Sequence, residues 1–348
     1  MFPKEFVWGA ATSSYQIEGA ILQDGRGECI WHRFTHTPGT IDDGSNGDVA
    51  CDHYHRYRED VALMAGLGLD AYRFSIAWPR VIPAGTGPTN PAGLDFYDRL
   101  VDELLRHDIT PFVTLYHWDL PQALQERGGW ENPDSVGWFC DYAALMAARL
   151  GDRVKHWITH NEPWVIAFLG NYTGEHAPGQ RSLTAAYTVA HHLLLSHGAA
   201  VPAIRQNVPG AQVGITLNLD HVEPATPSEA DRQAARRQDG YLNRWFLDAV
   251  FHGCYPQDVV ALVEPALERI TPQDISAAAV PLDFLGINNY TRQVITASEE
   301  GPFYARSVRP AGPRCRRCRT AARWWWCRRG AAPRWAAGSR PRSLPWVP

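Results

Sequence analysis

Lysine is almost absent from this chain, although basic residues are not. Only Lys4 and Lys155 are lysines among 33 basic residues, and the other 31 are arginines. No run of 18 apolar residues occurs, which argues against a membrane-spanning helix. The first twenty residues also lack the apolar core of a secretory signal. We therefore expect a cytoplasmic protein without a membrane partner.

Close cysteine spacings and glycine-rich phosphate turns are missing from residues 1–313. Cys29, Cys51, Cys140 and Cys254 are too far apart in sequence for a small disulfide scaffold or a typical metal site. No G-x-G-x-x-G turn follows any β-rich segment, which argues against a dinucleotide site. We expect no cofactor and no catalytic metal.

Acidic residues are missing from the tail, residues 314–348, which contains ten arginines, five tryptophans and three cysteines. Residues 1–313 then have a net charge of −14 and the tail +10, which together give the −4 of the whole chain. Translation of G+C-rich codons in the wrong frame produces this amino-acid composition, so we hypothesise a frameshift near residue 313. We expect the tail to be disordered and separate from the fold of 1–313.

The composition of the tail is open to two other interpretations. Its arginines and tryptophans would suit a nucleic-acid-binding arm. Cys315, Cys318 and Cys327 would suit zinc, but a structural zinc site has four ligands and no histidine follows His252. We favour unselected residues, no zinc and no nucleic-acid partner.

Short β-rich segments alternate with segments of helical apolar spacing. An example of the second kind is the i, i+3, i+4 pattern of Leu94, Tyr97, Val101 and Leu104. Repeated β-then-α order predicts a mainly parallel sheet, either doubly wound or closed as a barrel. The six candidate strands are Phe6–Ala10, Ala71–Ala77, Thr110–Tyr116, His156–Thr159, Gln212–Leu217 and Asp283–Asn288.

Polar and aromatic residues follow the candidate strands, where an α/β barrel has its active site. The third strand leads into Tyr116–Pro121, and the fourth into Thr159–Trp164. Amide and imidazole groups can bind sugar hydroxyls, and indole rings stack on a pyranose. Glycoside cleavage also needs a proton donor, and Glu162, between an amide and an indole, fits this role.

The ordered motifs resemble glycoside hydrolase family 1, a family of β-glucosidases and β-galactosidases. The resemblance covers roughly residues 1–310 and implies an α/β fold, a (β/α)8 TIM barrel. It rests on Phe6–Thr12, Ser14–Gly19, Tyr72–Trp78, Tyr116–Pro121, Thr159–Pro163, Gly174 with Ala177–Gly179, and Asp283–Asn288.

The resemblance also assigns roles in a retaining β-glycosidase. Glu162 is implied as the general acid/base. The other implied roles are glycone binding for Gln16, His117 and Asn161, shaping of the pocket for Trp118, the leaving-group side for Trp164, and contact with the nucleophile for Arg73 and Tyr290. Arg73 was also weighed as a buried structural ion pair. A small β-glycoside or oligosaccharide is the implied substrate, as in cellulose degradation, while the oligomeric state stays open.

The family's nucleophile motif, Ile/Val-Thr-Glu-Asn-Gly, does not occur in this sequence. Its last carboxylates are Glu299 and Glu300, and neither precedes Asn-Gly. By the resemblance, strands seven and eight of the barrel are missing or replaced after residue 313. We expect an incomplete barrel with exposed edges, poor solubility and impaired activity. The alternative is a non-catalytic sugar-binding pseudoenzyme.

Three further groups were interpreted as structural. His160 alternates to the strand face opposite Asn161, so core packing is expected. Asp52, His53, His55 and Asp60 are assigned to a helix with one solvated face. The segment 31–34 is expected to pack in a loop after the first strand.

The frameshift hypothesis makes a direct prediction about the gene. Translation in the alternate frame downstream of codon 313 is expected to produce a Thr-Glu-Asn-Gly segment. Resequencing this region and translating all three frames checks it. Absence of that segment from every frame would refute the hypothesis.

Overall fold

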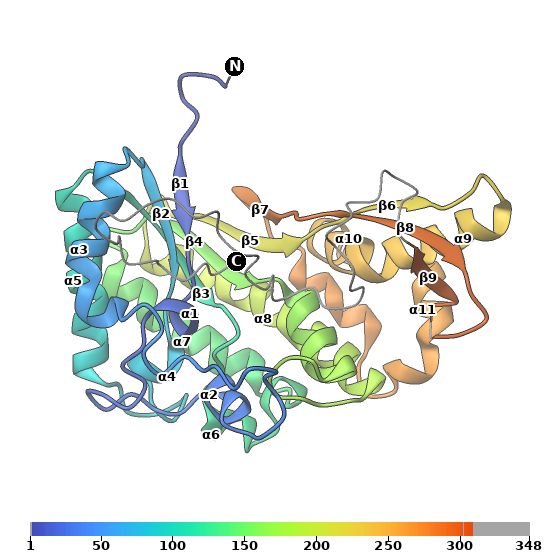
Figure 1. Cartoon of the computed structure of the whole chain (residues 1–348), viewed down its shortest axis with the longest axis horizontal. Helices are drawn as coiled ribbons and strands as arrows, with labels where there is room; N and C mark the ends of the chain where they lie inside the picture. Colours follow the sequence, from blue (N-terminus) through green and yellow to red (C-terminus); the bar gives the residue numbers. More distant parts are fainter. Residues whose placement is uncertain (1, 302, 309–348) are drawn as a thin grey trace, which may run out of the picture.

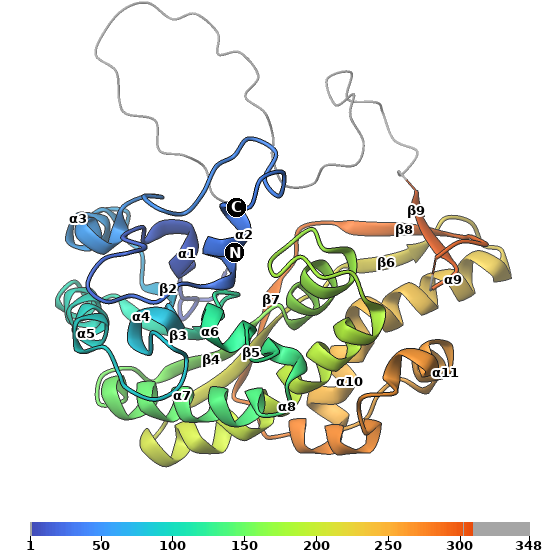
Figure 2. The same ribbon diagram turned by 90° about the horizontal axis from the view of Figure 1, so that it is seen from below.

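A curled sheet of six parallel strands forms the centre of the molecule (Figures 1 and 2). The structure is a computed structural model that describes residues 2–301 and 303–308, so the predictions for residues 314–348 lie outside it. Along the sheet the strands are β1 (Gly9–Ala11), β2 (Ala71–Ser75), β3 (Thr110–Tyr116), β4 (His156–Asn161), β5 (Gln212–Asn218) and β7 (Phe284–Asn288).

Long helices pack side by side against one face of this sheet, as Figure 2 shows for α3, α5, α7 and α8. The α-helices are α1 (Ser14–Ile17), α2 (Ile30–Thr35), α3 (His53–Gly66), α4 (Trp78–Val81), α5 (Pro91–Arg106), α6 (Gln122–Gln125), α7 (Ser135–Leu150), α8 (Leu183–Asn207), α9 (Glu229–Asp239), α10 (Trp245–His252) and α11 (Gln257–Val263). Three segments are 3-10 helices: η1 (Gly129–Glu131), η4 (Glu264–Leu267) and η5 (Pro272–Ala278). Two are π-helices: η2 (Val165–Thr173) and η3 (Gly240–Arg244).

Apolar periodicity explains why α5 lies on the sheet. Leu94, Tyr97, Val101 and Leu104 are all buried, and Pro91 occupies the first turn, where its missing N–H is not needed. The predicted amphipathic helix is confirmed. In the described residues β1 and β7 do not pair with each other, so the sheet is not closed and has the architecture of an incomplete (β/α)8 barrel.

The first strand is shorter than the predicted Phe6–Ala10. Pairing with β2 begins at Gly9 opposite Ala71, so the preceding residues extend past the end of β2, the neighbour of β1 in the described sheet. Trp8 instead hydrogen-bonds to Asp70 and packs on Phe6 with ring centroids 4.6 Å apart. Trp8 is 52% exposed.

A second, three-stranded sheet was not predicted from the sequence. It consists of β6 (His221–Pro224), β8 (Arg292–Ala297) and β9 (Ala305–Val308), with β8 in the middle. Within the described part of the chain, β1 and β7 are the outer strands of the main sheet, which confirms the expected open edges. Ile287 on β7 is 58% exposed. Poor solubility stays a prediction.

The segment 31–34 is helical, so the predicted loop was wrong. Cys29 has an extended backbone, and helix α2 starts at the next residue. Phe34 on α2 is buried, and Trp31 packs edge-on against it at 5.7 Å. An aromatic pair three residues apart fits one side of a helical turn, which explains the local structure.

A buried ion pair joins the start of the chain to α4 and α5. The Nε of Arg80 donates to Glu18 Oε2 at 2.9 Å, and the Tyr97 hydroxyl donates to Glu18 Oε1 at 2.6 Å. Arg80 also lies over the ring of Tyr54, 4.2 Å from its centroid. Both charged residues are at most 3% exposed, so loss of either one would leave the other as an uncompensated buried charge.

Replacement of Arg80 by methionine is expected to destabilise the fold by about 3–5 kcal/mol, because it leaves the Glu18 carboxylate buried without its cation. Urea denaturation followed by circular dichroism measures the effect. Arg56→Leu is the control, since Arg56 pairs with Glu59 on the surface and exposed pairs contribute little. Equal midpoints for the two variants would contradict the prediction.

Candidate active site

The carboxyl ends of five neighbouring strands bring polar side chains to one rim of the sheet. Register places Arg73 beside Phe112, Asn161 beside Thr216, and Asn218 beside Asn288. Because the strands are parallel, their ends meet on the same side. Residues up to 127 positions apart in the sequence are therefore hydrogen-bonded to one another at this rim.

The side-chain amide of Asn161 is the centre of this rim. Its Oδ1 accepts from Arg73 Nη2 at 2.6 Å and from Asn288 Nδ2 at 3.1 Å, which uses both lone pairs. Its Nδ2 is 3.2 Å from His117 Nε2 and donates to it. These contacts fix which way the amide faces, with the oxygen toward the cation and the nitrogen toward the imidazole.

Glu162 follows directly and has a left-handed backbone with φ of 54°. Such a conformation costs a non-glycine residue about 1–3 kcal/mol and is concentrated at functional sites. The β4–β5 ladder shifts register between Ile158 and Asn161, and the Glu162 N–H donates to the Thr216 carbonyl at 2.8 Å. The strand thus ends with the Glu162 side chain held at the rim, 4% exposed.

Two opposing influences set the proton affinity of Glu162. Burial raises its pKa above the ordinary value. A 2.8 Å hydrogen bond from Asn288 Nδ2 and the charge of Arg73 act in the other direction, but burial prevails. Burial also lowers the pKa of Arg73 to about 10, so this guanidinium is still charged at neutral pH. A carboxyl with raised proton affinity is suited to donating a proton.

His117 and Trp118, two further candidates from the sequence, lie beside Asn161. Burial and the nearby Arg73 charge keep the pKa of His117 well below its ordinary value, so the imidazole is neutral. Its Nε2 accepts from Asn161, which puts the proton on Nδ1, an atom without a hydrogen-bond partner in the described residues. Trp118 donates from Nε1 to the Asn161 carbonyl at 2.9 Å and stacks near Trp31.

The other predicted site residues make no hydrogen bond to Asn161 among those described. Gln16 is partly buried in α1. Trp164 packs against Phe168 and Tyr241, with centroid distances of 6.0 and 5.6 Å. Tyr290 is 70% exposed, yet partial burial and the Glu162 carboxylate raise the pKa of its phenol.

Asp119 is a buried residue of the rim that the sequence analysis did not single out. Burial raises its pKa to about 7, and Ser14 Oγ donates to its Oδ2 at 2.6 Å. This bond links the segment after β3 to helix α1, which contains Gln16. The sequence feature that indicates Asp119 is its place in the motif Tyr116–Pro121, directly after the two predicted site residues His117 and Trp118.

His160 and the cluster near residue 53 lie away from this rim. The His160 ring stacks on Phe139 at 4.3 Å and its Nε2 is 2.8 Å from Ser196 Oγ, as expected for core packing. His53 pairs with Asp60 on helix α3, at 2.6 Å. No described helix is both long and apolar enough to cross a membrane.

Comparison with known proteins agrees with a barrel enzyme whose site lies at the carboxyl ends of its strands. The sequence model of glycosyl hydrolase family 1 matches residues 1–329, past residue 313, and the chain belongs to this family of glycoside-hydrolysing enzymes. It is 49% identical to beta-glucosidase A of Acetivibrio thermocellus over 312 residues, which are 88% of this chain and 70% of that protein. The thermostable beta-glucosidase B of Thermobispora bispora is 52% identical over 86% of this chain and 62% of its own length.

A solved structure shares the fold. The family 1 β-glucosidase from Thermotoga maritima superposes with a TM-score of 0.87 at 45% identity, over 90% of this chain and 70% of that one. The same enzyme is also solved in complex with deoxynojirimycin.

The raised pKa of Glu162 makes a prediction about stability against pH. A group whose pKa is higher folded than unfolded contributes stability that is present below its unfolded pKa and lost as the pH rises through the folded value. Glu162→Gln removes this dependence while keeping the shape. We therefore expect the stability of the variant relative to the unsubstituted chain to increase from pH 4.5 to pH 8.

Urea denaturation at several pH values measures this difference. Glu59→Gln, an exposed carboxylate on α3, controls for the loss of one charge. The prediction fails if the Glu162→Gln difference stays constant across this range or follows that of Glu59→Gln.

Proposed function

We propose that this chain carries the acid/base half of a retaining β-glucosidase site, with Glu162 as the general acid/base. The observation that supports this most is the buried carboxyl of Glu162, held by Asn288 and with its pKa raised by burial. In the first step it protonates the departing glycosidic oxygen. In the second it takes a proton from the attacking water.

Glycone binding is proposed for Gln16, His117 and Asn161, with Trp118 as a wall of the pocket. The neutral His117 has its Nδ1 proton available for a sugar hydroxyl. Trp164 is proposed for the leaving-group side. A small β-D-glucoside or oligosaccharide is the proposed substrate, in line with the names of the β-glucosidase relatives.

The second carboxylate is the missing component. Retaining hydrolysis requires a nucleophile about 5–5.5 Å from the acid/base. The printed sequence contains no acidic residue after Glu300. Arg73 and Tyr290 are the proposed neighbours of that nucleophile. The Arg73 charge opposes the rise that burial causes in the pKa of Glu162, and burial and the Glu162 charge raise the pKa of Tyr290. We propose that the chain binds β-glucosides but turns them over poorly.

Two further features belong to this proposal. Residues 1–313 form the glycosidase unit, and residues 314–348 are a separate segment. A cytoplasmic location is proposed because the four cysteines of the described chain are free thiols, as is usual in a reducing compartment.

Turnover of 4-methylumbelliferyl β-D-glucoside, with and without added azide, tests the assignment. Azide can attack the anomeric carbon from the face where the nucleophile is absent. The carbon–oxygen bond then breaks, and the phenol oxygen takes its proton from Glu162. We expect slow release that azide accelerates, with an α-glucosyl azide as product.

Glu162→Gln is expected to reduce the azide-dependent rate by about 10²-fold or more, since it removes the proton donor. Glu223→Gln is the matched control, because Glu223 pairs with Arg292 at 2.9 Å and is not among the groups that shift the pKa of Glu162. Its azide-dependent rate is expected to be unchanged. Fast, azide-independent turnover would contradict the absence of a nucleophile. Sugar binding without turnover in azide would instead identify a non-catalytic sugar-binding protein.

A further inference from the structure

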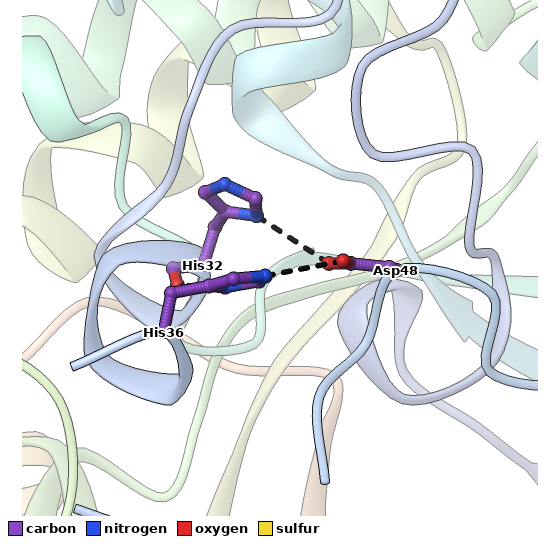
Figure 3. A group of neighbouring side chains, drawn as sticks. All are labelled: His32, His36 and Asp48. Carbon is purple, nitrogen blue, oxygen red and sulfur yellow. Dashed lines mark hydrogen bonds and ion pairs between the residues drawn. The ribbon is translucent and has the colours of Figure 1, made fainter. Parts of the chain in front are cut away.

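Two histidines and an aspartate converge beside the rim, outside the proposed sugar site. His32 lies on α2, His36 directly follows it, and Asp48 comes from the loop after the helix. Figure 3 shows both imidazoles directed at the Asp48 carboxylate. One donor atom from each of the three residues lies within 4.8 Å of the others.

Helical spacing explains why the histidines meet. Residues four apart lie on one face of a helix, and the two rings are 4.3 Å apart between centroids. Histidines separated by three residues are also a common zinc-ligand spacing. The intervening Arg33 does not compete for Asp48, because Glu28 binds its Nε and Nη2 at 2.8 and 2.6 Å.

Contacts around the cluster leave donor atoms without ordinary hydrogen bonds. His32 Nδ1 and Asp48 Oδ1 face each other at 3.6 Å, and neither has a hydrogen-bond partner in the described chain. His36 Nδ1 is 2.8 Å from the His32 carbonyl, to which it donates, and its Nε2 is hydrogen-bonded to Asp48 Oδ2 at 3.1 Å. Zinc binding at Nε2 would replace this second hydrogen bond. A ring nitrogen bound to a backbone carbonyl is a usual outer contact of a metal-ligating histidine.

We propose that His32 Nδ1, His36 Nε2 and the Asp48 carboxylate bind a divalent transition metal ion, with Zn²⁺ as the best-suited ion. Ligands about 2.0–2.1 Å from a tetrahedral zinc lie about 3.3 Å from one another. The donors of His32 and His36 are 3.6 and 3.1 Å from Asp48 oxygens, close to that spacing. Water completes the coordination, because the His36 and Asp48 side chains are 39% and 37% exposed.

Metal binding at this place joins α2 to the loop before α3. That loop also contacts Tyr15, because the Gly47 N–H donates to the Tyr15 hydroxyl at 3.4 Å. The same hydroxyl is 2.8 Å from Thr35 Oγ1 on α2. The ion therefore holds a loop that borders the segment of Gln16, and it takes no part in the glycoside chemistry.

Calorimetric titration of the full chain with Zn²⁺ tests the site. Cys315, Cys318 and Cys327 are replaced by serine throughout, so that these thiols cannot contribute. We expect one zinc per chain, and at least tenfold weaker binding in His32→Asn and in Asp48→Asn, a loss that even outer contacts of a metal cause. His55→Asn is the matched control. His55 contacts Asp52 at 2.6 Å, but among the described residues it belongs to no group of three possible metal ligands.

Hydrogen exchange supplies a second measurement. Zinc is expected to slow exchange in residues 37–48 of the unsubstituted site and not in Asp48→Asn. Absence of binding, equal affinity in all variants, or binding abolished by the cysteine substitutions alone would overturn the proposal. Circular dichroism without zinc confirms that each variant is folded before its affinity is compared.

Discussion

The side-chain amide of Asn161 is the contact on which the rest of the rim depends. Its oxygen accepts hydrogen bonds from Arg73 on β2 and Asn288 on β7, and its nitrogen donates to His117, which follows β3. One planar group thus joins four segments of the sheet. An amide is suited to this place because it presents an acceptor and a donor on opposite sides without adding charge. A carboxylate here would repel Glu162, and an aliphatic side chain would leave buried polar groups unpaired.

Much of the fold could be predicted from the sequence because a parallel sheet leaves a strong pattern. Strands covered on both faces become short apolar runs, and the helices between them keep one apolar stripe, as in α5. The six strands of the main sheet were therefore found, with errors at their ends. The limits of β1 depend on where β2 begins to pair with it, at Gly9 opposite Ala71, which the local sequence does not encode.

Other features had no such pattern. In the sheet of β6, β8 and β9, β6 pairs with β8 about 70 residues later, and the strands are short and partly exposed. Within the site, motifs indicated Glu162, Asn161 and His117, but the contact of Asn288 with both Asn161 and Glu162 depends on register across β4, β5 and β7. The convergence of Asp48 on His32 likewise depends on the path of a loop.

The contacts that hold Glu162 come from strands of the described sheet. Thr216 on β5 binds its backbone, Asn288 on β7 binds its carboxylate, and Arg73 on β2 supplies the nearby positive charge. The carboxyl proposed as the proton donor is therefore oriented by these strands, and burial, with a smaller contribution from the Asp220 charge, raises its pKa without a catalytic nucleophile beside it. A catalytic nucleophile imposes the opposite requirement, because it must stay ionised next to a buried acid. The two roles are physically separable, and the contacts around Glu162 are those that the proposed acid/base requires.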